Sequence, residues 1–528
     1  MKSPARCLGL AAVAAFILVW NPVLAQKSGG VLKIEHMDNP PSASIHEEAT
    51  FSVVMPFMAL FNNLVMFDQH VARNSLESVV PELATSWTWS GDGKGLSFKL
   101  RQGVKWHDGK PFTAKDVACT FDLLIDPDKL RRNPRAAWWG NLEKVTVESD
   151  FDVTIHLKRR QPALLALLAS GYTPIYPCHV PTADMRRKPI GTGPFKLAEF
   201  KMNESIKLVK NPDYWKPGLP YLDGIEYTII PDRSTRMLSF ISGKFDMTLP
   251  VDVTVPLLKT IRKDAPNAQC TMRSTGVAAN LIVNRDKPPF NDPKIRRAMA
   301  LTLDRAAFND ILNEGQGRMS GALLPPPEGM WGLTPEMLKS IVGYGDVGRA
   351  REEARALMKE AGYGPDKPLK IKVSTRNIAV FRDPAVILID QLKHIWIEAE
   401  LEIVDTAVYY NRIFKKDYFV AMNYSGSAVD DPDVTLFEGY ACGSLRNYDG
   451  YCNARMTALF EAQSEEVDQK KRQQMVWEID RLLQEDVARP IISNQLAAGC
   501  WHPWVKNYTI QTNSIYNGWR FEDIWLDR

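Results

Sequence analysis

Residues Pro81–Val117 read "PELATSWTWSGDGKGLSFKLRQGVKWHDGKPFTAKDV", and this stretch decides the fold. Residues 87–89 and 96–100 alternate apolar and polar side chains on either side of the turn-forming "GDGKG". Val104 and Trp106 continue the alternation. A period of two residues is typical of a strand with one buried face. The stretch therefore predicts an antiparallel β-meander, with Trp106 on the buried face of a strand.

The end of this stretch concentrates residues that could be mistaken for an active site. "DG" at 108–109 is a hairpin-type turn signal, and Thr113 and Asp116 have the spacing of a capping box ahead of the apolar "VACTFDLL". His107 alternates to the face opposite Trp106, so we expect it to point toward solvent. The sequence therefore predicts strand, turn and capped helix, which is a scaffold and not a catalytic site.

The N-terminus has the features of a secretory signal over residues 1–25. Lys2 and Arg6 precede the apolar run "CLGLAAVAAFILVW", and the small residues Val23 and Ala25 predict cleavage near Ala25. The apolar run is shorter than the roughly 20 residues that a membrane span needs. No cysteine follows the cut, so a lipid anchor is not expected. These features predict a soluble protein exported to the periplasm.

Composition narrows the class of protein further. Without Lys2 and Arg6, 63 basic residues stand against 62 acidic ones. This balance gives no electrostatic reason to expect nucleic acid or an anionic membrane as a partner. Apolar residues make up 45% of the chain, and a chain of this length exceeds what one core usually organises, so two or three domains are expected.

The pattern of predicted secondary structure changes along the rest of the chain. Residues 191–215 form a second β-rich segment. From Lys370 onward strands and helices alternate, which predicts an α/β lobe with parallel pairing; its first helix is expected to start at 383–384, where "DP" supplies a cap and a first turn. Residues 291–310 predict one further helix, and 489–499 ("RPIISNQLAAG") predict a buried return strand.

Six cysteines remain after the predicted cut, an even number in an oxidising compartment, which permits disulfides. Cys442 and Cys452 bracket the turn-rich "GSLRNYDGY", and this spacing predicts a bond between them. The pairing of the other four stays open, with Cys119–Cys178 and Cys270–Cys500 as the hypothesis.

Signatures of known catalytic sites are missing from the sequence. It contains no GxSxG, HExxH or GxxxxGK[ST] motif. Its eight histidines are scattered, with no two at i, i+4, so no metal site and no cofactor is predicted. A Ser–His–Asp triad could still be assembled from distant residues. A secreted hydrolase therefore stays an alternative, although a protein that is not an enzyme is the main interpretation.

Several segments together resemble one family. Besides the opening stretch they are "GTGPFKLAEF", "LVKNPDYW", "DPKIRRAMALTLDR" and the paired-cysteine "ACGSLRNYDGYCN". They are similar to the extracellular solute-binding proteins of family 5, the periplasmic dipeptide-, oligopeptide- and nickel-binding components of ABC importers. The resemblance runs from about Leu32 to the end and keeps the family order of segments.

The resemblance implies an α/β fold of two lobes, a type II, cluster C-like periplasmic-binding-protein clamshell with an extra subdomain in lobe I. The implied lobe I core consists of residues 26–63, 190–272 and 498–528. The implied extra subdomain consists of residues 64–189, and the implied lobe II of residues 273–497. Ligand would bind between the lobes, where clefts commonly hold ligands.

The resemblance also implies ligand-binding residues. In dipeptide-binding members an aspartate in a "DPD"-like loop binds the ligand amine, which here gives Asp430 and Asp431 in "YSGSAVDDPD". The partner of the ligand carboxylate would be Arg376 in "VSTRN". One acid and one guanidinium suit ammonium and carboxylate ends. Tyr424 and Trp501, at the ends of predicted strands, are candidates for the apolar walls.

Alternatives for these residues stay open. Asp431 could cap a helix or turn beside Pro432, and Arg376 could form a surface or inter-lobe ion pair. "SGSAV" stands where many members have a tryptophan followed by acidic or glycine-rich residues, so the cargo could differ from a peptide. Nickel would favour histidine or carboxylate ligands, and the sequence offers no histidine cluster.

The expected function is a periplasmic receptor that captures a small solute, foremost a short peptide, and delivers it to a membrane permease with a cytoplasmic ATPase. We expect a monomer. Besides the hydrolase, the alternative is a chaperone or sensor that binds peptides without transport.

Overall fold

The structure is a computed structural model that describes residues 26–126 and 128–528. The predicted signal peptide lies outside these residues. Within them, no helix is both long enough and apolar enough to cross a membrane.

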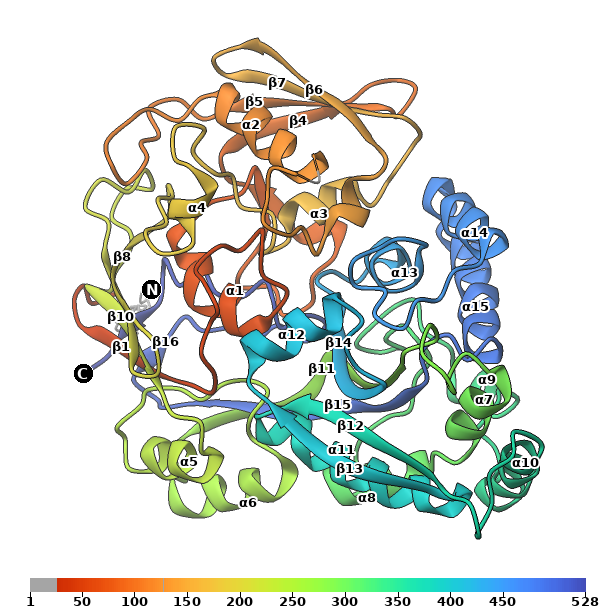
Figure 1. Cartoon of the computed structure of the whole chain (residues 1–528). Helices are drawn as coiled ribbons and strands as arrows, with labels where there is room; N and C mark the ends of the chain where they lie inside the picture. The colour runs from red at the N-terminus through yellow and green to blue at the C-terminus, as the bar shows by residue number, and fades with distance from the viewer. Residues whose placement is uncertain (1–25, 127) are drawn as a thin grey trace, which may run out of the picture.

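Three main β-sheets organise the described residues (Figure 1). The first has the order β1-β10-β9-β8, and β1 is parallel to β10 while the other pairs are antiparallel. Its strands are β1 (Val31–His36), β8 (Phe195–Lys201), β9 (Ser205–Lys210) and β10 (Gly224–Ile229). This sheet joins the start of the chain to a segment about 190 residues later in sequence, and it forms the core of lobe I.

The second sheet contains the antiparallel strand pair predicted from the opening stretch, β4 and β5, and lies at the top of Figure 1; its other two strands come from residues 142–157, so the stretch does not form a meander by itself. Its order is β4-β5-β7-β6, antiparallel throughout. Its strands are β4 (Ala84–Trp89), β5 (Gly95–Leu100), β6 (Leu142–Ser149) and β7 (Asp152–Leu157). Helix α2 (Ala114–Ile125) packs against β6 and β7. The alternation seen in the sequence is real, because Leu96, Phe98 and Leu100 are buried while Ser97 and Lys99 are exposed.

The third sheet forms the core of lobe II, with the order β13-β12-β14-β11-β15. Its strands are β11 (Gln269–Val283), β12 (Leu369–Arg376), β13 (Ile397–Val404), β14 (Val420–Gly426) and β15 (Ile491–Trp501). β12 is parallel to β13 and β14, as the strand–helix alternation predicted. Two-stranded pairs complete the β-structure: β2 (Val65–Phe67) with β3 (Val79–Pro81), and β16 (Val505–Lys506) with β17 (Trp525–Leu526).

The remaining helices surround these sheets. They are α1 (Phe51–Phe57), α3 (Leu164–Ala169), α4 (Thr182–Met185), α5 (Arg233–Ile241), α6 (Val255–Asp264), α7 (Pro293–Leu301), α8 (Arg305–Asn313), α9 (Pro335–Leu338), α10 (Val347–Glu360), α11 (Ala379–Leu392), α12 (Thr406–Phe414), α13 (Pro432–Tyr440), α14 (Ala454–Glu465) and α15 (Gln469–Glu485), with short 3-10 helices η1 (Met58–Leu60), η2 (Leu76–Ser78), η3 (Ala136–Trp139) and η4 (Lys393–Ile395).

Two long strands connect the lobes. β11 and β15 pair along most of their length, and both cross the lower middle of Figure 1. Within this pair Met272 lies opposite Ala498, and Arg273 lies opposite Ala497. The lobe boundaries expected from sequence, 272/273 and 497/498, thus fall at neighbouring positions of one ladder. The boundaries themselves stay a prediction.

Two helix predictions were wrong in detail. The single helix expected over 291–310 is two helices, because Asp304 accepts a hydrogen bond from Ala307 N (3.0 Å) and caps the second one. Helix α11 begins at Ala379 and not at 383–384, so Pro384 lies inside it. Its start is set by burial, since Phe381 packs edge-on against Tyr424 with ring centroids 5.0 Å apart.

The expected orientation of His107 was also wrong. β5 ends at Leu100, so the alternation does not extend to this residue. Instead Nδ1 of His107 accepts a hydrogen bond from Gly191 N (3.2 Å), and Nε2 donates to Gly193 O (3.2 Å). Burial lowers the pKa of His107 to about 4, consistent with a neutral ring that donates through one nitrogen and accepts through the other. Trp106 is buried as predicted, but it lies beyond the end of β5 and not on a strand.

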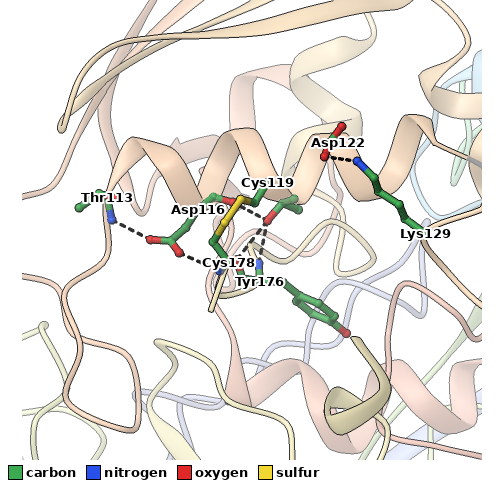
Figure 2. The surroundings of a disulfide bond; sticks show 8 residues. Thr113, Asp116, Cys119, Asp122, Lys129, Tyr176 and Cys178 are labelled. Carbon is green, nitrogen blue, oxygen red and sulfur yellow. Dashed lines mark hydrogen bonds and ion pairs between the residues drawn. A yellow bond between two sulfur atoms is a disulfide. The ribbon is translucent and has the colours of Figure 1, made fainter. Parts of the chain in front are cut away.

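The structure contains the predicted Cys442–Cys452 disulfide and, among the four cysteines whose pairing was left open, Cys119–Cys178 and Cys270–Cys500. Figure 2 shows Cys119–Cys178 beside the predicted capping box. Asp116 accepts from Thr113 N (2.9 Å) through one carboxylate oxygen and from Cys178 N (2.9 Å) through the other. Asp116 therefore caps α2 and fastens the neighbouring loop, which is a structural and not a catalytic role.

Candidate functional site

Two adjoining cavities lie beside the junction of the lobes: cavity A is almost wholly within lobe II and reaches lobe I at Asn513, and cavity B lies between the lobes. Cavity A is formed by the end of β14, the loop after it and α13, with Asn513 from the C-terminal segment, and encloses about 800 Å³ including solvent at its mouth. Cavity B, about 510 Å³ on the same measure, lies between residues 49–52 of lobe I and the β12–α11 segment of lobe II. Arg446 lines both cavities.

The lobes touch each other around these cavities. Gln161 of the extra subdomain donates to Asp433 of α13 (3.0 Å), and Asn517 Nδ2 donates to Ala428 O (2.8 Å). Arg132 Nη1 donates to Asn411 Oδ1 of α12 (2.9 Å). These contacts come from separate parts of lobe I, so the structure shows the lobes closed over the cavities.

Arg376 forms an inter-lobe ion pair, one of the two alternatives open from the sequence. Its Nη2 lies 2.6 Å from Oδ2 of Asp38, which follows β1 in lobe I, and its Nε donates to Thr406 Oγ1 (3.0 Å). The guanidinium also stacks on Phe381, 4.4 Å from the ring centroid. Thr406 in turn donates to Asp38 (2.8 Å). Arg376 lines cavity B, but two of its three nitrogens are already used, one by Asp38 of lobe I and one by Thr406 of lobe II.

Asp431 has the capping role that the sequence left open. It is the N-cap of α13 and accepts from Asp433 N (2.9 Å). Arg472 binds its carboxylate through two nitrogens, at 2.8 and 2.7 Å. A carboxylate held by a bidentate guanidinium and a backbone N–H has little capacity left for a ligand.

Asp430 is less occupied than Asp431. Its Oδ1 accepts a long hydrogen bond from Met330 N (3.4 Å), and its Oδ2 lies 3.8 Å from Arg73. Only 10% of its side chain is exposed. Burial raises the pKa of Asp430 to about 6. Because the acid lines cavity A, a cation entering that cavity would find an acceptor whose charge is incompletely compensated.

The two predicted aromatic walls are not brought together. Tyr424 lines cavity B. It pairs with Ala279 on β11, whereas Trp501 pairs with Gln269, ten residues earlier on the same strand. At about 3.3 Å per residue the two positions are on the order of 30 Å apart. Trp501 packs on Tyr508 and lines neither cavity.

The sequence did not single out Arg446 or Glu438. Arg446 lies within the Cys442–Cys452 loop, and its Nη1 is ion-paired with Oε1 of Glu438 on α13. Both side chains are more than nine-tenths buried, and both line cavity A. A charged residue inside a short disulfide loop was the available signal, because such a loop rarely contributes to a core.

Two further groups stand behind this pair. Arg135, from the extra subdomain, stacks on Tyr172 with its guanidinium carbon 3.2 Å from the ring centroid. Tyr172 packs on Tyr516, with ring centroids 5.1 Å apart, and Tyr516 lines cavity B. Burial raises the pKa of Tyr516 to about 12, so its hydroxyl stays neutral.

No three histidine, cysteine, aspartate or glutamate side chains of residues 26–126 and 128–528 cluster so that they could hold a metal ion.

Two lobes joined by paired strands, with charged cavities at their junction, define a binding protein of the clamshell type. The chain matches the model of the bacterial extracellular solute-binding proteins, family 5 Middle, over residues 78–446. It therefore belongs to this family, and the resemblance seen in the sequence is confirmed.

Among its relatives is Di/tripeptide-binding protein 2 of Pseudomonas aeruginosa, 28% identical over 346 residues, which are 60% of this chain and 60% of the relative. Helicobacter pylori DppA, solved with the peptide STSA, has a TM-score of 0.83 at 23% identity, over 95% of this chain and 99% of that one. PBP AgaA of A. tumefaciens R10, solved with agropinic acid, has a TM-score of 0.83 at 22% identity, over 94% and 99%. These structures share the two-lobed fold of this chain.

Proposed function

We propose that this protein is a periplasmic receptor of an ABC importer, which captures a short peptide between its lobes and delivers it to a membrane permease. The observation that carries the proposal is the charge arrangement of cavity A, where Asp430 and Arg446 line one cavity at the lobe junction. A carboxylate and a guanidinium in one desolvated cavity suit the two ends of a zwitterion. The family membership and a di/tripeptide-binding relative support this ligand class.

We infer that the ligand ammonium binds Asp430 and not Asp431. Both were candidates from the sequence, but Asp431 is satisfied by Arg472 and by its capping bond. Asp430 accepts one long hydrogen bond and lies at the cavity wall. Tyr424 supplies an apolar wall to cavity B.

Arg376 contributes by holding the lobes closed. Because Asp38 and Thr406 occupy two of its nitrogens, its main effect on affinity comes through the closed state. Binding at the junction would stabilise that state, and closure excludes water that would otherwise screen the charges.

The receptor, hydrolase and chaperone interpretations make different predictions. The family and the relatives named above are binding proteins and give no support to a hydrolase. A receptor should be stabilised by ligand without turnover, by about 2.7 kcal/mol when free ligand is 100 times its Kd. A chaperone or sensor would bind peptide but would not support uptake with a permease and its ATPase.

The experiment is native mass spectrometry of protein purified without denaturation, followed by titration calorimetry with a di- and tripeptide library. One peptide bound per chain, recovered unchanged after prolonged incubation, is the expected result. Recovery of hydrolysed peptide would support the hydrolase, and failure of every peptide to bind would remove the peptide from the proposal.

A further inference from the structure

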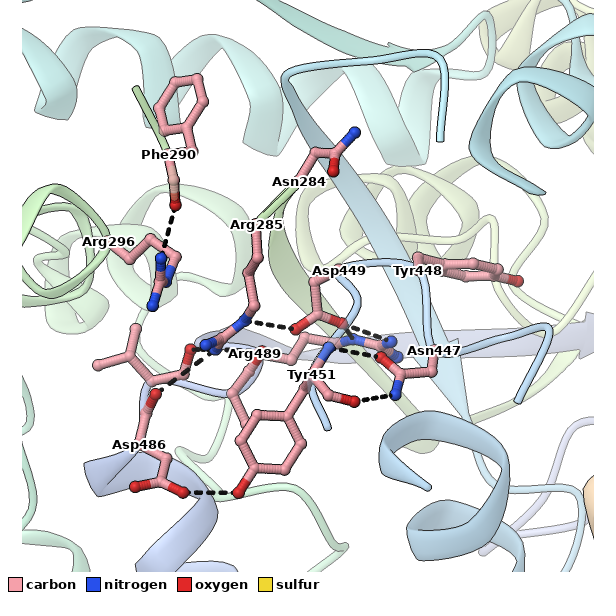
Figure 3. A network of polar contacts seen from close by, with 12 residues as sticks. Asn284, Arg285, Phe290, Arg296, Asn447, Tyr448, Asp449, Tyr451, Asp486 and Arg489 are labelled. Atoms are coloured by element: carbon pink, nitrogen blue, oxygen red, sulfur yellow. Dashed lines mark hydrogen bonds and ion pairs between the residues drawn. The ribbon is translucent and has the colours of Figure 1, made fainter. Parts of the chain in front are cut away.

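The Cys442–Cys452 loop carries Arg446 to the boundary of the two cavities and holds it there. The disulfide closes the loop, and Arg489, at the start of the return strand, binds its inner side (Figure 3). Nη2 of Arg489 donates to the carbonyl oxygens of Gly439 (3.1 Å) and Arg446 (2.9 Å), and to Asp449 Oδ1 (3.0 Å). The backbone at Arg446 is thus fixed by a covalent bond and by a buried ion pair.

The guanidinium of Arg446 is only partly used by the protein. Its Nη1 is paired with Glu438, and its Nε donates to Tyr448 Oη (3.2 Å). Its Nη2 has no hydrogen-bond partner among the described residues. The side chain is 9% exposed and lines both cavities. One donor group of a rigidly held arginine is therefore left at the point where the cavities meet.

The arginines near this point differ in whether a carboxylate pairs with them. Three arginines at the cavities have carboxylate partners, namely Arg376 with Asp38, Arg446 with Glu438 and Arg489 with Asp449. Arg135 has none. It is 3% exposed, its Nη1 donates to Glu48 O (2.8 Å), and its Nε and Nη2 have no partner.

Arg135 is close enough to influence the cavity wall. It stacks on Tyr172, which packs on Tyr516 at cavity B. Burial lowers the pKa of Arg135, the nearby Tyr172 and Glu438 raise it, and the charge of Arg446 lowers it. An uncompensated guanidinium in a low-dielectric interior raises the affinity of the adjoining cavity for an anion.

We propose that Arg446 binds a carboxylate of the ligand through Nη2, and that Arg135, acting from behind Tyr172 and Tyr516, strengthens this site. The proposal rests on the proposed function and deepens it, because it assigns the ligand class as compounds that carry a carboxylate. It also gives two arginines different roles: Arg446 contacts the ligand, whereas Arg376 closes the lobes.

The test is calorimetry on the full mature chain with three sets of probes. They are Ala-Xaa dipeptides with a free carboxyl group, the same dipeptides amidated at the C-terminus, and N-acetyl amino acids, which have a carboxylate but no ammonium. Each set is titrated into the native protein and into Arg446→Lys, which keeps a cation beside Glu438 but loses the planar guanidinium. A Glu438→Gln/Arg446→Gln double variant removes both charges of the pair together, so neither is left buried without the other.

The matched control is Arg520→Lys. Arg520 forms a fully buried pair with Glu82 (3.2 Å) and lines neither cavity. It reports the effect of the same substitution on folding alone.

The free acids should bind at least tenfold more tightly than their amides to the native protein and to the control. The ratio should fall to about one in both Arg446 variants. If dipeptides bind but amidation makes no difference, or if the ratio survives in the Arg446 variants, the inference is overturned and the peptide receptor stands. If no dipeptide binds but N-acetyl amino acids bind through Arg446, the peptide proposal fails and the carboxylate site stands. If no probe binds, both are overturned.

Discussion

The Asp38–Arg376 pair should control how tightly the protein binds its ligand, although Asp38 lies outside the walls of both cavities. The pair joins residues 338 positions apart, with side chains 11% and 5% exposed, and is bridged by Thr406. Asp38→Asn removes the negative charge and leaves the guanidinium buried. When the lobes open, Arg376 can be hydrated instead. The penalty therefore falls on the closed state.

The size of the effect follows from this burial. Removing one partner of a buried, hydrogen-bonded pair costs about 2–5 kcal/mol. The lower part of that range applies, because asparagine still offers an oxygen to Arg376 and the stacking on Phe381 remains. About 2–3 kcal/mol against closure weakens binding by roughly 30- to 150-fold.

The assay is calorimetry with the tightest-binding dipeptide, together with small-angle scattering to measure how compact the ligand-free protein is. Asp383→Asn is the control, because Asp383 also pairs across the lobes, with Arg233 at 3.2 Å, but is 49% exposed. An exposed pair contributes about 0.2–1 kcal/mol, so its loss should weaken binding less than about fivefold. If Asp38→Asn binds within threefold of the native protein, or no more weakly than Asp383→Asn, the reasoning is refuted.

Three further predictions concern the pH dependence, the scaffold and the disulfide loop. The pKa of Asp430, raised to about 6 by burial, lies above its unfolded value of about 3.9. Its ionisation therefore destabilises the fold as pH rises through this window, and Asp430→Asn should raise the stability at pH 7 by at most about 2–3 kcal/mol. In the native protein, peptide affinity should fall below about pH 6. A calorimetric pH profile without this fall would contradict the role of Asp430. In denaturant titrations, Trp106→Ala should cost about 3–5 kcal/mol of unfolding free energy, and His107→Ala about 1–3 kcal/mol. A hundredfold loss of peptide affinity in a folded His107→Ala protein would argue against a scaffold role. Replacing Cys442 and Cys452 by serine should cost roughly 2–3 kcal/mol of unfolding free energy for a loop of this length, and it should weaken the binding of free acids more than that of amides. Equal weakening would show that the loop has no role in carboxylate recognition. Free thiols in non-reducing peptide maps of the native protein would show that the bond is absent in solution.

Much of the fold could be predicted because its signals are local. The alternation over 96–100, the capping box of Thr113 and Asp116, and the strand–helix alternation after Lys370 depend on residues close in sequence. The Cys442–Cys452 bond was predictable for the same reason. The errors arose where a local pattern was extended beyond its element, as for His107 beyond the end of β5.

The candidate site was only partly predictable. The family motif located the loop that carries Asp430 and Asp431, but it could not show that Arg472, 41 residues away, satisfies Asp431. It located Arg376 without its partner Asp38. Arg446 was missed because its place in a short disulfide loop was the one local signal, and that signal does not show that the residue lines two cavities.

Strand and helix periods, caps and turns follow from the chemistry of neighbouring residues, so the primary structure alone specified the class of fold and the family. Which acids remain available to a ligand depends on which distant guanidinium approaches each carboxylate, and only the tertiary structure settled that. Charge compensation falls steeply with distance and rises in a buried, low-dielectric site. It is therefore a property of the folded arrangement, and no stretch of the chain specifies it alone.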